Sequence, residues 1–148
     1  MENFYKKQAE SNKDNSLKVV FDMLAKEEEN HSRILSANAD KLTIPLEESH
    51  ILNESQLIFK NLEPVKSDIH KTPTQLELYR YALDKEEESV KLYRDLYAKA
   101  TTDEVKTVFS YLIKQEETHC IIIGELVKLV SRPEEWVESP EFGLREEY

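Results

Sequence analysis

The chain is poor in the residues that interrupt helices or cross-link a fold. Of its 148 residues, 2 are glycine, 5 are proline and 1 is cysteine. So few turn-forming residues argue against an all-β fold built from many tight turns. The lone cysteine, Cys120, excludes an internal disulfide framework and any four-cysteine iron or zinc site made by this chain alone.

Long hydrophobic runs are also missing. No stretch approaches the length that a membrane span requires, and the first ten residues, MENFYKKQAE, lack the apolar core of a signal peptide. We therefore expect a cytoplasmic protein that does not use a membrane. The formal net charge of −10 argues against nucleic acid as a partner. An acidic surface would attract cations, although surface carboxylates are common.

The residues that are present suit one helical domain. The apolar fraction is 39% and the charged fraction is 34%, which is typical of a helical protein with solvated outer faces. A chain of this length can also bury a substantial core.

Spacing and capping residues predict an all-α fold of two helical hairpins. The predicted helices cover residues 1–11, 15–39, 73–100 and 101–130. The connection over 40–71 contains Pro45 and Pro64 and is too long for a tight turn, so it is expected to cross the bundle, with a short helix near 56–61. The predicted domain is therefore 1–130, followed by a C-terminal extension, 131–148, whose role is not readable.

The two hairpins repeat one another. A shift of 88 residues superimposes Glu28 on Glu116 and His31 on His119, and it also aligns Phe21 with Phe109 and Leu24 with Leu112. Hairpins related in this way can pack around a pseudo-two-fold axis, so a site on that axis would receive equivalent ligands from both halves.

Ionisable residues interrupt the apolar stripes of three predicted helices. They are Glu28 and His31, Glu86, and Glu116 with His119. Three carboxylates and two imidazoles brought to one level of a core would be costly without a compensating cation. A glutamate and the histidine three residues later share one helix face, so both can reach the same metal. Their oxygen and nitrogen donors suit iron or manganese, and zinc is a further option.

The alternative is a set of buried ion pairs that only gives structural specificity. A single Glu-x-x-His motif is weak evidence in a chain with 30 acidic residues. Two copies on core stripes, with a third glutamate on the core stripe of another helix, favour a metal.

The other members of the runs 27–29 and 86–88 are expected in solvent. We expect His50 and His70 at the surface and a buried or half-buried Cys120 thiol. Tyr5, Tyr79, Tyr93 and Tyr97 are expected to pack, with a redox role for Tyr93 or Tyr5 as the alternative.

These motifs resemble the rubrerythrin and ferritin-like diiron-carboxylate family. The matching segments are Leu24-Ala25-Lys26-Glu27-Glu28-Glu29-Asn30-His31, Gln115-Glu116-Glu117-Thr118-His119, and Glu86 six residues before Leu92-Tyr93. The resemblance implies a ferritin-like four-helix bundle holding two iron ions. It also implies that Glu28 and Glu116 bridge the metals, that His31 binds one, and that His119 with Glu86 binds the other.

One expected ligand has no counterpart. The repeat places the partner of Glu86 three positions before Met1, so either the start of the first helix lies outside this chain or the site is asymmetric. An asymmetric site predicts a well-occupied metal at Glu86 and His119 and a weaker one at His31. Glu2, one turn further along the first helix, is a candidate substitute.

The resemblance favours a non-haem diiron oxidoreductase acting on peroxide or dioxygen. Iron sequestration, or a helix-bundle interaction protein with impaired metal binding, are the alternatives. A peroxidase would need an external electron donor, because this chain lacks the four-cysteine module often fused to such enzymes. The native metal and the substrate are not specified, and a homodimer through an exposed helix face is left open.

Overall fold

The structure is a computed structural model that describes residues 1–63 and 71–131. It contains five helices and, in the described ranges, no strand: α1 (Glu2–Ser11), α2 (Leu17–Ala39), α3 (Ile51–Leu62), α4 (Pro73–Lys99) and α5 (Asp103–Ser131). Nearly all of the predicted C-terminal extension lies outside the described residues, as does His70. The predicted all-α class is confirmed.

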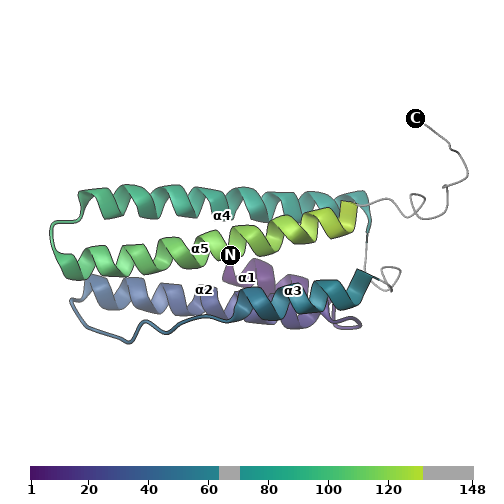
Figure 1. Ribbon diagram of the computed structural model, residues 1–148, viewed down its shortest axis with the longest axis horizontal. Coiled ribbons are helices and arrows are strands. Elements are labelled where there is room, and N and C mark those ends of the chain that lie inside the picture. The colour runs from purple at the N-terminus through teal and green to yellow at the C-terminus, as the bar shows by residue number, and fades with distance from the viewer. Residues whose placement is uncertain (64–70, 132–148) are drawn as a thin grey trace, which may run out of the picture.

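The helices form two hairpins, as the sequence predicts. α1 packs against α2, and α4 packs against α5 along its length (Figure 1). The connection after α2 runs back along the bundle to α3, which packs against both α2 and α5. The ferritin-like helical bundle with a long crossover is therefore confirmed.

The helix ends follow their capping residues. The Thr72 side chain accepts a hydrogen bond from the Gln75 amide at 3.1 Å, with Pro73 at the first helical position. Thr102 accepts from the Val105 amide at 3.2 Å at the start of α5. The helix expected near 56–61 is longer, because buried side chains at Ile51 and Leu62 extend its apolar face at both ends.

The core consists of two apolar clusters. One includes Phe21 on α2, Tyr79 on α4 and Leu126 on α5; the other includes Ile34, Tyr93, Phe109 and Leu112. On all three helices, the predicted metal-binding residues lie between the positions that feed these two clusters. The site is therefore enclosed within the core. Tyr97, predicted to pack, is 41% exposed instead, and the neighbouring Leu96 packs against the second cluster.

None of the helices in the described ranges is long and apolar enough to cross a membrane.

Candidate metal centre

Four of the five predicted ligands meet at one point in the core. Glu28 on α2, Glu86 on α4, and Glu116 and His119 on α5 each offer a ligand atom, and these atoms all lie within 4.8 Å of one another. Glu86 and His119 are fully buried and Glu116 is 1% exposed. Long-range packing of three helices thus gathers residues that are separated by up to 91 positions in sequence.

His119 lies at the centre of the group. Its Nδ1 is 2.8 Å from an oxygen of Glu86, 3.0 Å from one of Glu28 and 3.1 Å from one of Glu116. One ring nitrogen therefore faces three carboxylates. This is the geometry of a ligand set drawn together around a position that a cation can take.

His31, the fifth predicted ligand, lies beside this group. Its Nδ1 is 3.7 Å from Glu116 Oε1, and its ring stacks on that of His119 with centroids 5.6 Å apart. The structure therefore places His31 next to Glu116 and His119.

The polar atoms that lack partners test whether a metal fits. His31 Nδ1, Glu86 Oε1 and Glu116 Oε1 are buried and make no hydrogen bond within the described chain. Leaving such atoms unsatisfied in a core costs about 1 to 3 kcal/mol each. All three belong to predicted ligands. An ionised carboxylate oxygen can only accept, and His31 Nδ1 accepts because the proton of the neutral ring is on Nε2, which faces the Gln115 oxygen. The residues present therefore fit a cation bound among them.

Burial and mutual repulsion perturb the two most enclosed carboxyls. Burial raises the pKa of Glu116, and the charges of Glu86 and Glu28 raise it further, against the opposing effect of His119. Burial likewise raises the pKa of Glu86. Carboxyls in this condition favour either a proton or a metal in place of their free charge.

The two histidines are shifted in opposite directions. Burial opposes the charged form of His119, but its hydrogen bonds to the surrounding carboxylates raise its pKa well above the ordinary value. Burial, with the charge of His119, lowers the pKa of His31. Burial alone would raise the pKa of Glu28, but the hydrogen bond with His119 and the charges of His119 and His31 together lower it. In the metal-free protein, these shifts favour an imidazolium at His119 among the carboxylates and a neutral ring at His31.

α1 contributes a tyrosine and not the expected glutamate. The Tyr5 hydroxyl, which is fully buried, donates a hydrogen bond to Glu86 Oε2 at 2.9 Å. The candidate substitute Glu2 instead pairs with Lys6 at 2.7 Å on the helix surface. Helix α1 therefore places no terminal carboxylate at the metal position proposed for His31.

Two further residues contact the histidines of the centre, although the sequence did not predict them as site residues. Glu27, expected in solvent, is largely buried and lies 2.8 Å from His119 Nε2. Gln115, named only as part of the resemblance, is buried and lies 2.5 Å from His31 Nε2. Both sit one position before a predicted ligand and so beside the inward stripe, where helix periodicity alone gives little warning. The 88-residue repeat offers a signal, because it aligns the two.

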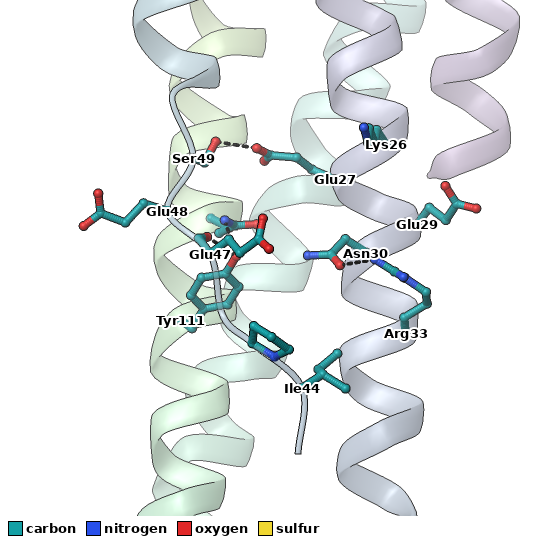
Figure 2. A pocket seen from close by; sticks show the side chains of 12 residues that line it. Lys26, Glu27, Glu29, Asn30, Arg33, Ile44, Glu47, Glu48, Ser49 and Tyr111 are labelled. Carbon is teal, nitrogen blue, oxygen red and sulfur yellow. Dashed lines mark hydrogen bonds between the residues drawn. The ribbon is translucent and has the colours of Figure 1, made fainter. Parts of the chain in front are cut away.

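A cleft of about 750 Å³ lies at the surface beside the centre. It lies between α2, α5 and the crossover, and Figure 2 shows the side chains that line it. Glu27 and Gln115, which contact the two histidines, are among the lining residues. The other ionisable side chains around the cleft are Lys26, Glu29, Arg33, Glu47, Glu48 and Tyr111.

The remaining candidates lie away from the centre or beside it. His50 is exposed at the start of α3, as expected. Cys120 is half-buried, and burial, helped by the charges of Glu86 and Glu87, raises the pKa of its thiol to about 12. This thiol is therefore protonated at neutral pH and is a poor metal ligand.

Comparison with known proteins agrees with this site. A family model described as Rubrerythrin matches residues 1–126. Searches of curated proteins and of solved structures gave no significant match. The matched region contains both Glu-x-x-His motifs, Glu86 and Tyr5, all of which meet at the buried centre. The chain therefore belongs to the rubrerythrin family.

Proposed function

We propose that this chain is a diiron-carboxylate oxidoreductase that acts on peroxide or dioxygen. The observation that carries the proposal is the set of buried acceptor atoms without partners on His31, Glu86 and Glu116. Together with Glu28 and His119 they offer oxygen and imidazole donors from three helices, which is a donor set suited to iron. Manganese and zinc are alternative occupants.

The proposed roles of the residues follow from their places. Glu116 lies between the two histidines, 3.1 Å from His119 and 3.7 Å from His31, which supports a bridging role for it. Glu28, which contacts His119 from the facing helix, is the second proposed bridge. Glu86 and His119 would serve one metal position, and His31 the other.

Iron bound here would supply the electrons that reduce the oxidant. The protein would hold the metals in a site shielded by the two apolar clusters, with Tyr5 fixing the Glu86 carboxyl by its hydrogen bond. The cleft over Glu27 and Gln115 is the proposed approach for a small oxidant. An external electron donor in the cytoplasm would return the centre to its reduced state.

Peroxide consumption by iron-loaded protein tests this function. Protein loaded anaerobically with Fe(II) is expected to consume hydrogen peroxide while a ferric absorption band develops, and to do so repeatedly when a chemical reductant is present. Glu116→Ala, loaded in the same way, is the matched control and is expected to be inactive. Bound iron that does not react, or a mineral core that grows in a large assembly, would contradict the oxidoreductase and, in the second case, indicate storage.

A further inference from the structure

Each histidine of the centre is held from outside by a residue of the opposite hairpin. Glu27 on α2 contacts Nε2 of His119 on α5 at 2.8 Å, and Gln115 on α5 contacts Nε2 of His31 on α2 at 2.5 Å. Glu27 and Gln115 are 88 positions apart, as are the two histidines. The two contacts are therefore the same contact, repeated by the pseudo-two-fold relation of the hairpins.

These contacts select the ring nitrogen that is left for a metal. Carboxylate and amide oxygens accept hydrogen bonds, so Nε2 of each ring is the donor and carries the proton. In the neutral ring, the lone pair then lies on Nδ1, which faces the carboxylates in His119 and lacks a partner in His31. Glu27 and Gln115 are thus positioning residues, which act on the metal through the imidazoles.

The crossover connection holds both positioning residues. The Ser49 hydroxyl donates a hydrogen bond to Glu27 (Figure 2). Gln115 donates from its amide nitrogen to the Tyr111 hydroxyl at 2.8 Å, and that hydroxyl donates to the Glu47 carbonyl. The Gln115 amide therefore has its oxygen directed at His31. The segment that joins the hairpins fixes both contacts from the same side, over the cleft.

The two contacts differ in charge, and this difference has a chemical consequence. A carboxylate that accepts the Nε2 proton makes the imidazole a more basic and stronger metal ligand, whereas a neutral amide orients the ring with less effect on its basicity. We propose that the Glu27–Gln115 difference makes the two metal positions unequal, with tighter binding at His119 than at His31. This inference rests on the proposed diiron function, and it agrees with the single terminal carboxylate, Glu86, also lying on the His119 side.

An anaerobic titration of metal-free protein with Co(II), followed by its visible absorption bands, tests the inference. Wild type is expected to bind in two steps, of which His119→Ala removes the tighter. Glu27→Gln keeps the shape and an acceptor oxygen but removes the charge, so it should weaken the tighter step by about 10- to 100-fold and shift its bands. Gln115→Glu should strengthen the weaker step.

Glu29→Gln is the matched control. Glu29 is an exposed residue of α2 that lines the same cleft, so its substitution removes the same charge without touching either histidine. It should leave both steps within about twofold of wild type, because exposed charges act weakly through solvent. Circular dichroism would show that every variant is folded.

The outcomes separate the inference from the function on which it rests. If wild type takes up no metal, the proposed function is overturned and this inference falls with it. If wild type binds two ions and Glu27→Gln affects neither step more than Glu29→Gln does, the inference alone is overturned. Complete loss of the tighter step in Glu27→Gln would also overturn it, since Glu27 would then be a direct ligand.

Discussion

At the scale of single residues, the centre brings together buried ionisable side chains, and some of their polar atoms make no hydrogen bond within the described chain. Glu116 adjoins both histidines, since its Oε1 lies 3.1 Å from His119 Nδ1 and 3.7 Å from His31 Nδ1. Its removal should therefore affect both metal positions, whereas removal of His31 should affect one.

We expect Glu116→Ala to lose metal binding at both positions. His31→Ala, by contrast, should retain one tightly bound ion, because Glu86, His119 and Glu28 remain together. Metal content after anaerobic loading and desalting measures both effects. Equal loss from the two substitutions would contradict the assignment of separate positions.

The free energy of unfolding of the metal-free protein should depend on pH, because the Glu116 carboxyl is buried. The folded-state pKa of Glu116 is raised from 4.5 to about 8, so this group contributes stability below pH 4.5 that is lost as the pH rises towards 8. Glu116→Gln cannot titrate. Its free energy of unfolding relative to wild type should therefore increase across this interval and then level off.

Denaturant unfolding of both proteins at several pH values measures this difference. Other groups titrate in the same range, but they are common to both chains and largely cancel in the comparison. A difference that stays constant over the interval would show that Glu116 is not held in its protonated form.

At the scale of helices, the apolar stripes were sufficient to predict most of the helical structure, and the ligand set that they suggest stays a prediction. Steps of three and four residues place Glu28, Glu86 and Glu116 on the inward stripes; Glu86 and Glu116 are buried, and Glu28 is partly buried beside them. Helix periodicity predicts which face is buried, because one face of each helix must leave water.

Residues beside a stripe could not be predicted in this way. Whether Glu27 meets solvent or His119 depends on the packing angle of α2 against α5 and on Ser49, a residue of an irregular connection. Tyr5 presents the same difficulty, since its periodicity predicts packing but not the hydrogen bond to Glu86. Contacts between distant segments are set by tertiary packing, which the sequence pattern of one helix does not contain.

The hydrogen bond between Tyr5 and Glu86 helps to hold the short helix α1 against the centre. Tyr5→Phe removes the only hydrogen bond found for Glu86 apart from that with His119 in the described chain. We expect the metal-free protein to lose about 1.5 to 3 kcal/mol of unfolding free energy, the usual net contribution of a hydrogen bond to a charged group.

Tyr93→Phe is the matched control for this element. The 88-residue repeat aligns Tyr93 with Tyr5. Tyr93 is 9% exposed, but its hydroxyl makes no side-chain hydrogen bond among the described residues. A loss of stability in Tyr93→Phe as large as that in Tyr5→Phe, measured by denaturant unfolding, would show that packing and not the Glu86 contact is responsible.

At the scale of the whole molecule, the centre joins the two hairpins. Glu28 and His31 come from the first, and Glu86, Glu116 and His119 from the second, while α2 and α5 meet directly over part of their length. A metal bound among these residues would cross-link the halves of the bundle, and a ligand that binds only the folded state raises the stability of that state.

We therefore expect Mn(II) or anaerobic Fe(II) to raise the thermal unfolding midpoint of the wild type, and a chelator to reverse the change. Glu116→Ala should show no such rise. Calorimetry with and without metal measures both. A rise of equal size in Glu116→Ala would place the stabilising metal elsewhere on this acidic protein.

The number of iron ions that the buried centre binds can be counted. Metal-free protein would be titrated with Fe(II) under anaerobic conditions, and the iron retained per chain would be measured. We expect about two ions per chain, bound in two unequal steps, with the stronger step lost in His119→Ala. No retained iron, or retention that His119→Ala leaves unchanged, would show that the centre is not a diiron site.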